Sequence, residues 1–313
     1  MISALGIYLG FKNFDFSQFA KSLSDVNIFM LVLSIILQIV NIFFRAVRWK
    51  IILDEVKVID LRKVFGATAI GYFGNNVFPF RMGEILRAYV LGDNENTSKM
   101  SIFGTVIVER TIDTIVFITI FLLALLLIHD IPVWINTIAI YGLILFVFLL
   151  VLGYIFLFIR EKNYSMIVNQ INKLDKGIGE RILKLLGGLR SLIMVKRKVS
   201  LAFFSFLVWF LSILFIYTIG LSYNIYIGFK EIILLFFASS IAVSIPSAPG
   251  YIGTFHAGVI GVMLYLGYSR DVSQGFSIVL HGVGFVTLTL LGLYYFIKLN
   301  VRLRNVEIYG GYK

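Results

Sequence analysis

The 313-residue chain contains no cysteine, which excludes disulfide bridges, thiolate nucleophiles and thiolate metal sites. Charged residues are also scarce, because they make up 14% of the sequence against about 25% in soluble domains. With 59% hydrophobic and 16% aromatic residues, the chain lacks the polar surface that would keep a monomer in water. The lipid bilayer is therefore the expected solvent.

Long uncharged windows support this expectation, since a transmembrane helix needs about 20 predominantly apolar residues. Such windows occupy residues 28–44, 114–128, 133–159, 201–229 and 272–297. We predict an all-α polytopic membrane protein, a helical bundle of about six to eight transmembrane helices in a single domain that spans residues 1–313. The apolar stretch at residues 1–11 is too short for a normal span, and we expect a short helix within an N-terminal segment 1–27.

The net charge of +11 could suggest nucleic acid, but the position of the basic residues argues against it. Ten of the 28 lysines and arginines lie in residues 160–198, six in 45–63 and four from 298 onward. These blocks follow helix ends, as the positive-inside rule expects of cytoplasmic segments. We therefore expect anionic membrane lipids as partners, a cytoplasmic-membrane location and a cytoplasmic C-terminus, and we expect no nucleic acid; a homo-oligomer stays open.

Proline is rare, and three of the four prolines lie in two segments that do not fit as simple spans. By the charge topology, segment 64–92 starts and ends in the cytoplasm, whereas segment 231–267 starts and ends outside. Each breaks in the middle, the first at "NNVFPF" and the second at "SIPSAPGYIGT". Because proline breaks a helix and lipid does not tolerate exposed irregular backbone, we predict two re-entrant helical hairpins from opposite faces. Kinks in ordinary spans are the alternative.

Interrupted segments in corresponding positions of two halves point to a transporter site near the membrane midplane. The chain shows no strong internal sequence repeat, so we expect the symmetry to be topological only. Residues 160–198 differ from both hairpins: apolar residues recur there at steps of three and four between basic ones. This pattern predicts a basic amphipathic segment on the cytoplasmic surface, either as one helix or as two helices broken near Gly187 and Gly188.

Three charged residues, Glu109, Arg110 and Asp113, lie within an otherwise apolar helix. A charge at the centre of a membrane helix costs about 2.5 to 3.5 kcal/mol even on insertion scales, so these residues need partners. The candidate partners are arginines of the first hairpin or of the preceding helix end: Arg81, Arg87, Arg45 and Arg48. A structural network that pins the hairpin and a substrate site both predict contact between these segments.

The second break contains no ionisable residue except His256, whose ring could donate to a headgroup or serve as a buried structural residue. His129 is expected in a loop, and His281 as a buried hydrogen-bonding group. No Asp-x-Asp, Asp-Asp or His-Glu-x-x-His pattern occurs, so no metal site and no cofactor are expected.

Three motifs, in this order after "FRAVRW", resemble the flippase-like integral membrane domain of lysylphosphatidylglycerol synthases and its stand-alone relatives. The resemblance runs from about residue 28 to residue 300. The first motif falls on Asn76, Pro79, Arg81, Gly83, Glu84 and Arg87. The second falls on Glu109, Arg110 and Asp113, and the third on Pro246, Pro249, Gly250 and Gly253. Two departures stand out: Tyr251 and His256 occupy positions where many relatives have glycine and glutamate.

The resemblance implies translocation of a lipid or lipid-linked substrate, and not lipid aminoacylation. We therefore expect a flippase for an anionic phospholipid or a polyprenyl-phosphate-linked lipid, and no enzyme. In this reading three arginines hold the phosphate headgroup, three carboxylates orient them, and two asparagines cap broken backbone or bind the headgroup. These residues are Arg81, Arg87 and Arg110; Glu84, Glu109 and Asp113; and Asn75 and Asn76. A lipid-modifying transferase and a non-catalytic subunit of a cell-envelope pathway are the alternatives.

Overall fold

The computed structural model describes residues 2–11, 14–17, 19, 23, 26–127, 137, 140–148, 151, 171, 176–245 and 247–299. Within these residues all regular secondary structure is helical. Three of the helices are long and apolar enough to cross a membrane: α3 (Ile28–Leu53), α10 (Lys198–Ser222) and α13 (Arg270–Lys298). The prediction of an all-α membrane protein is confirmed.

Two of the three long helices, α3 and α13, begin where short polar side chains cap them. The Asn27 side chain accepts a hydrogen bond from the Met30 amide (3.2 Å) at the start of α3, and Ser269 accepts one from the Val272 amide (3.4 Å) at the start of α13. Each cap satisfies an amide that has no partner within its own helix. Helix starts are therefore encoded locally even in this apolar chain.

The first predicted break lies between α4 (Leu61–Val77) and α5 (Gly83–Asn94), which pack against each other as a hairpin. Phe78 is extended (φ −97°, ψ 146°), as a residue before proline tends to be, and the 3₁₀ turn η1 (Pro79–Arg81) follows. The Asn75 side chain then accepts a hydrogen bond from the Gly83 amide (3.0 Å) at the start of α5. Asn75 thus joins the two half-helices across the break.

The second break lies between α11 (Phe229–Ser244) and α12 (Thr254–Tyr265), with the 3₁₀ turn η2 (Pro249–Tyr251) between them. This break depends on left-handed backbone at Gly250 (φ 68°), Tyr251 (φ 60°) and Gly253 (φ 96°). Tyr251 is unusual, because residues other than glycine seldom adopt a positive φ. Pro246, the other predicted breaker, lies outside the described residues.

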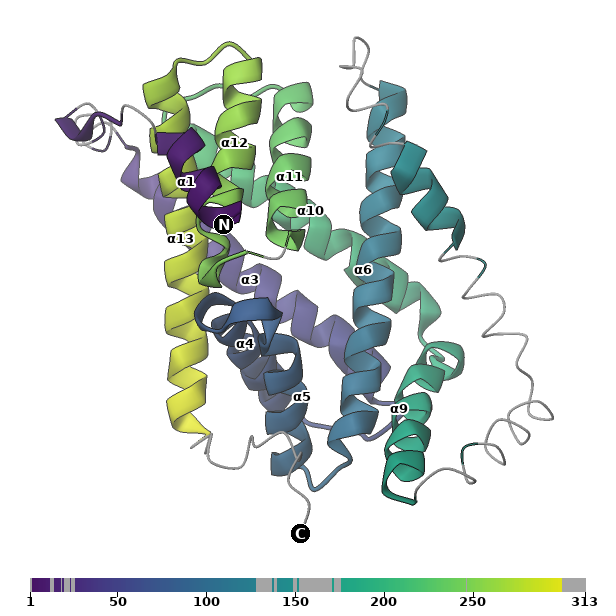
Figure 1. The fold of residues 1–313 in the computed structure, drawn as a ribbon. Helices are drawn as coiled ribbons and strands as arrows, with labels where there is room; N and C mark the ends of the chain where they lie inside the picture. The colour runs from purple at the N-terminus through teal and green to yellow at the C-terminus, as the bar shows by residue number, and fades with distance from the viewer. Residues whose placement is uncertain are drawn as a thin grey trace.

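Both hairpins consist of helices that are too short to span a bilayer. At about 1.5 Å per residue, the 17 residues of α4 and the 12 of α5 fall short of the hydrocarbon core of about 30 Å. The hairpin α4–α5 occupies the lower half of Figure 1 and α11–α12 the upper half, with their breaks facing each other. Entry from opposite faces of a membrane stays a prediction.

The structure contains an internal repeat of helix order and length, in line with the expected topological symmetry between two halves. The first repeat, α3 to α6 (residues 28–127), contains helices of 26, 17, 3, 12 and 29 residues, where α6 is Lys99–Leu127. The second repeat, α10 to α13 (residues 198–298), contains helices of 25, 16, 3, 12 and 29 residues. A constant offset of 170 residues separates Pro79 from Pro249, and Gly83 from Gly253.

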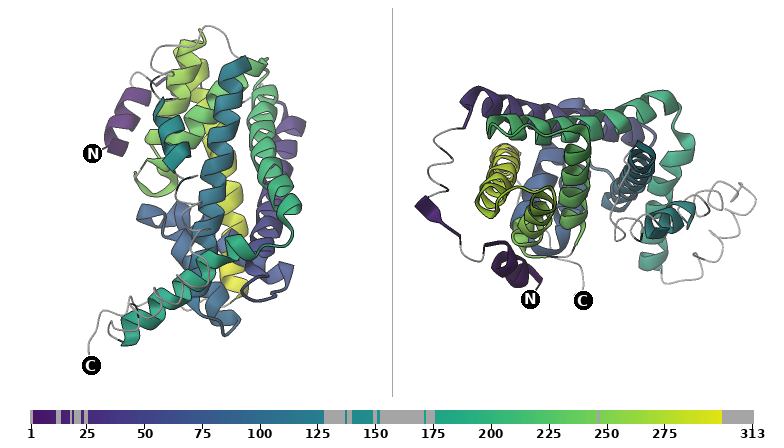
Figure 2. Two further views of the ribbon diagram at one scale, coloured as in Figure 1. Left: turned by 90° about the vertical axis from the view of Figure 1, so that its right-hand side faces the viewer. Right: turned by 90° about the horizontal axis from the view of Figure 1, so that it is seen from above.

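The two repeats run in opposite directions, so that each hairpin enters the bundle from its own end (Figure 1). Helices α3 and α10 lie side by side along one face of the molecule, as Figure 2 shows from above, and they make extensive contacts. The third residue of each 3₁₀ turn is left-handed, Arg81 (φ 55°) in the first repeat and Tyr251 in the second. The repeats therefore share backbone conformation at their tips as well as helix lengths.

Two further helices pack on the repeats. Helix α9 (Lys176–Met194) crosses the lower end of the bundle obliquely (Figure 2, left) and contacts α6 where Gly188 meets Gly104. It runs through Gly187 and Gly188 as one helix; residues 160–170 and 172–175 of the predicted basic segment lie outside the described residues. Helix α1 (Ile2–Phe11) packs on α12, and its 10 residues are too few to span a bilayer.

Candidate anion-binding site

Six charged side chains of the first repeat, four of them buried, form a closed ring in which arginines and carboxylates alternate. Arg48 of α3 pairs with Glu109 (2.7 Å) and Asp113 (2.5 Å) of α6. Arg87 of α5 pairs with the other oxygen of Glu109 (2.8 Å). We call the whole set the ion ring; its members are Arg48, Glu109, Arg87, Glu84, Arg110 and Asp113.

The ring closes through the start of α5. Arg87 pairs with Glu84 (2.7 Å), Glu84 pairs with Arg110, and Arg110 pairs with Asp113 (3.1 Å). Each carboxylate thus contacts two ring arginines, and each arginine contacts two carboxylates. The ring is neutral and joins α3, α5 and α6, so the predicted contact between the first hairpin and the charged helix is present.

Most of the ion ring is buried, so each charged side chain in it needs a counter-ion. The side chain of Arg48 is wholly buried and that of Glu109 is 2% exposed, whereas that of Arg110 is 31% exposed. A buried charge without a counter-ion is strongly destabilising, so removal of one partner costs about 3–5 kcal/mol. Arg87 also stacks over the Trp49 ring, with its guanidinium carbon 4.6 Å from the ring centroid. The ring therefore holds the hairpin firmly in place.

Two further arginines, Arg45 and Arg81, lie beside the ion ring but are not members of it. The Arg45 guanidinium donates to the Asn41 side chain (2.7 Å) and lies 3.7 Å from Asp113, which already has two ring partners. The guanidinium of Arg81, at the tip of the first hairpin, has no hydrogen bond or ion pair with any described residue. Five arginines therefore share three carboxylates, which leaves an excess of two positive charges in the middle of the bundle.

A cavity of about 280 Å³ lies where the two hairpin tips meet. Arg45, Arg81 and Arg110 all line it, and among the described lining residues there is no carboxylate. The three acids of the ion ring stand behind the guanidinium groups. The cavity thus presents positive charge to whatever enters it.

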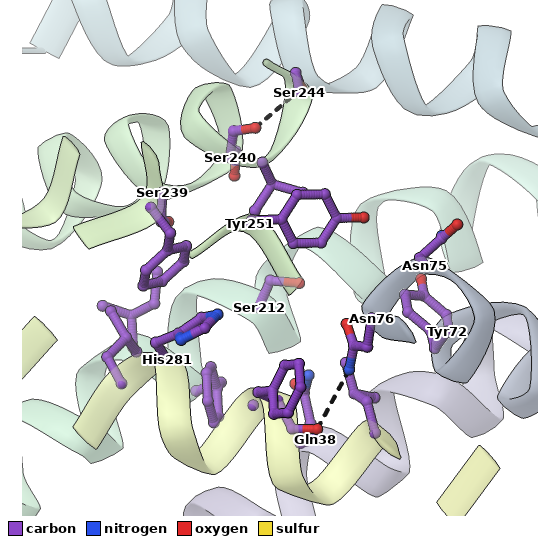
Figure 3. Close-up of a pocket in the computed structure, with 18 of the residues that line it drawn as sticks. Gln38, Tyr72, Asn75, Asn76, Ser212, Ser239, Ser240, Ser244, Tyr251 and His281 are labelled. Carbon is purple, nitrogen blue, oxygen red and sulfur yellow. Dashed lines mark hydrogen bonds between the residues drawn. The ribbon is translucent and has the colours of Figure 1, made fainter. Parts of the chain in front are cut away.

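The two repeats contribute different chemistry to the cavity wall. Every lining residue from the first repeat is polar: Gln38, Arg45, Tyr72, Asn75, Asn76, Arg81 and Arg110. All the aliphatic and phenylalanine side chains come from the second repeat, together with Trp209, Tyr251, His281 and four serines. Figure 3 shows Tyr72, Asn75 and Asn76 across the cavity from Ser239, Ser240 and Ser244. The first wall suits an anionic headgroup, and the second combines apolar side chains, which hydrocarbon can contact, with serine hydroxyls.

Helix α13 holds the two tips together. From the first hairpin, Asn76 donates to the Thr289 hydroxyl (2.9 Å) and the Phe285 carbonyl (3.3 Å). From the second hairpin, the Gly250 carbonyl accepts a hydrogen bond from Nε2 of His281 (2.7 Å). A side chain at Gly250 would meet the Phe285 ring at 2.6 Å, so only glycine allows this close approach.

The structure distributes the predicted site residues over three places. Asn75, Asn76, Arg81 and Arg110 line the cavity; Glu84, Arg87, Glu109 and Asp113 lie behind it in the ion ring. His256 lies elsewhere: its Nδ1 is 2.8 Å from the Ser277 hydroxyl, and its ring packs on Phe11 and His281. His281 is the histidine that lines the cavity.

Several residues that line the cavity were not predicted as site residues from the sequence. Arg45 and Arg48 were expected only as alternative ion partners, yet Arg45 lines the cavity and lies over the Trp209 ring (5.4 Å). The serines of α10 and α11 carry no signal in the sequence, because a serine in a membrane helix commonly bonds its own backbone, as Ser212 does to the Val208 carbonyl (2.9 Å). Within the described residues, no cluster of three His, Asp or Glu side chains is arranged to hold a metal ion.

The fold and this site define an integral membrane protein built around a buried cationic cavity. The chain belongs to the family described as the lysylphosphatidylglycerol synthase TM region, whose model matches residues 1–292. It is 25% identical over 279 residues to a UPF0104 membrane protein of Methanothermobacter thermautotrophicus, covering 83% of this chain and 82% of the relative. A UPF0104 membrane protein of Pyrococcus horikoshii is 27% identical over 304 residues, with 87% and 88% covered. No solved structure matches.

Proposed function

We propose that this protein binds the headgroup of an anionic phospholipid or lipid-linked phosphate in the central cavity and carries it across the cytoplasmic membrane. The main observation in support of this proposal is that the two repeats contribute different kinds of side chain to the cavity wall. Arg45, Arg81 and Arg110 line the cavity from the first repeat, while all the aliphatic and phenylalanine side chains of the wall come from the second repeat. A lipid with a negatively charged headgroup matches both surfaces at once.

The inverted repeat supports transport over simple binding. In transporters with this arrangement, the substrate site lies at the repeat interface, and access alternates between the two sides of the membrane. Here both hairpin tips meet at the cavity, and both hydrogen-bond to α13 through Asn76 and His281. A shift of one repeat against the other would open the cavity first to one leaflet and then to the other.

We further propose that the protein translocates its lipid without changing it chemically. A transferase needs a free carboxylate, imidazole or other group to move a proton or attack the substrate. The three carboxylates nearest the cavity, Glu84, Glu109 and Asp113, are each engaged by two arginines of the ion ring. The imidazole that lines the cavity, His281, hydrogen-bonds to the Gly250 carbonyl. Lipid recovered after transport should therefore have the same headgroup as the lipid supplied.

The test is translocation in liposomes that contain the purified full chain. Phosphatidic acid, phosphatidylglycerol and phosphatidylcholine, each labelled on an acyl chain, are added to one leaflet, and their extraction by albumin is followed with time. We expect faster translocation of the two anionic lipids than in protein-free vesicles, with little effect on phosphatidylcholine. Arg81→Gln should slow it at least tenfold.

Arg62→Gln is the matched control, because Arg62 is exposed at the start of α4 in the same hairpin and lies away from the cavity. It should translocate lipid at the wild-type rate. Equal rates for wild type, Arg81→Gln and protein-free vesicles would contradict the proposal.

A further inference from the structure

The positive charge of the cavity specifies how much negative charge the headgroup must bring. The ion ring is neutral, since three arginines alternate with three carboxylates. The two arginines outside the ring, Arg45 and Arg81, both line the cavity. The whole excess of two positive charges therefore faces the position that a ligand would occupy.

No described group can neutralise this excess from the protein side. The side chain of Asp113 is 3.7 Å from Arg45 but already pairs with Arg48 and Arg110 at shorter distances. Arg81 lies near enough to Glu84 to interact electrostatically, yet Glu84 pairs with Arg87 and Arg110. A singly charged headgroup would leave one guanidinium uncompensated in a low-dielectric site, whereas a doubly charged one would balance both.

The volume of the cavity and the arginines that line it also limit which headgroup can bind. A volume of about 280 Å³ is below the range of about 300–1,000 Å³ that is typical of pockets for drug-sized molecules. A phosphate group with its hydrocarbon attachment fits such a space. Arg45, Arg81 and Arg110 converge from three elements, α3, η1 and α6, and can each donate to a different oxygen.

We infer that the ligand is a lipid whose headgroup is a terminal phosphomonoester with two negative charges, rather than a phosphodiester with one. This inference rests on the proposed function and narrows its substrate class. A phosphomonoester carries about −1.5 to −2 charges near neutral pH, because its second pKa is about 6. It also offers three terminal oxygens, one for each arginine that lines the cavity.

The experiment compares two lipids with identical acyl chains, phosphatidic acid, a monoester, and phosphatidylmethanol, a diester, which differ by one methyl group and the negative charge that it removes. Binding to the full chain in phosphatidylcholine nanodiscs is measured at pH 8 by titration calorimetry, with inorganic phosphate as a third ligand. We expect wild type to bind phosphatidic acid at least tenfold more tightly than phosphatidylmethanol, and inorganic phosphate weakly. Arg81→Gln and Arg45→Gln should each remove most of this preference, while Arg62→Gln should keep it.

The outcomes separate this inference from the proposed function. Equal affinity for phosphatidic acid and phosphatidylmethanol, with both lipids translocated, overturns the inference and leaves transport of anionic lipids intact. Inorganic phosphate that binds as tightly as phosphatidic acid overturns the lipid assignment, because the ligand would then be a soluble phosphate. If neither lipid binds nor moves, the proposed function fails as well.

Discussion

Glu109→Gln and Arg48→Met each remove one member of the ion ring, and each breaks two almost completely buried ion pairs. The two substitutions differ in what they leave behind. Glu109→Gln raises the positive excess of the site from two charges to three, although each arginine that it leaves keeps one carboxylate, Arg48 through Asp113 and Arg87 through Glu84. Arg48→Met lowers the excess to one, and both acids keep another arginine, Glu109 through Arg87 and Asp113 through Arg110.

The two variants should therefore differ in stability. We expect Glu109→Gln to cost about 3–5 kcal/mol, because it adds a buried positive charge that no carboxylate compensates. We expect Arg48→Met to cost about 1–3 kcal/mol, because it lowers the positive excess and each acid loses only one of its two partners. One kcal/mol shifts the melting midpoint by about 2–4 °C in domains of 150–250 residues, and less in larger ones. At about 2 °C per kcal/mol, the lower end of that range, the expected falls are roughly 6–10 °C for Glu109→Gln and roughly 2–6 °C for Arg48→Met.

Thermal unfolding in nanodiscs, followed by tryptophan fluorescence, measures both midpoints. Lys184→Met is the control, because it breaks only the exposed pair between Lys184 and Glu180, and such pairs contribute about 0–1 kcal/mol. Phosphatidic acid should restore more of the lost stability in Glu109→Gln than in Arg48→Met, since the first variant has the larger positive excess. Equal losses, or a larger loss in Arg48→Met, would refute the charge count on which the site assignment rests.

Three further predictions concern the hairpin and the cavity. Gly83→Ala should abolish recovery of folded protein by gel filtration, because the added Cβ would lie 2.6 Å from the backbone nitrogen of Asn75. Gly261→Ala is the control and should be recovered as wild type, because a Cβ at Gly261 would have no neighbouring atom within 4 Å. Asn75→Leu should lower the free energy of unfolding by about 1–3 kcal/mol, because the Gly83 amide loses its buried acceptor. Asn94 is exposed, so Asn94→Leu should have little effect when thermal unfolding is measured in the same way. Phosphatidic acid brominated on its acyl chains should quench Trp209, which lines the cavity, and Trp209→Phe should remove most of that quenching; undiminished quenching would place the lipid elsewhere.

The fold could be predicted largely from the sequence because the decisive signals are local. Uncharged windows mark the long helices, and the extended Phe78 before Pro79 marks the end of α4. The internal repeat is visible as a topological symmetry and not as a sequence repeat, for a physical reason. Its halves share helix lengths and a few conformation-setting residues such as Pro79 and Pro249, but not side-chain chemistry. Val279 and Val283 in the second repeat correspond, at the offset of 170 residues, to the charged Glu109 and Asp113 of the first.

The site was only partly predictable because partner choice depends on distances between helices. The sequence indicates that Glu109 and Asp113 need arginines, but it cannot choose among Arg48, Arg81 and Arg87. The structure assigns Arg48 and Arg87 to the ring and leaves Arg81 free to face the cavity. The same limit applies to the histidines, since only the packing of α12 on α13 shows which ring reaches the cavity.

The central claim is that the two hairpins enter the membrane from opposite faces and meet at the cavity. Because the chain has no native cysteine, single cysteines at exposed positions flanking each hairpin can be tested with a membrane-impermeant thiol reagent in oriented vesicles. Val58 and Asn94 flank the first hairpin, and Tyr226 and Tyr265 flank the second. We predict that Val58→Cys and Asn94→Cys react from one side only, and that Tyr226→Cys and Tyr265→Cys react only from the other. If the two flanks of either hairpin reacted from opposite sides, that hairpin would be a kinked span, and the account would be wrong.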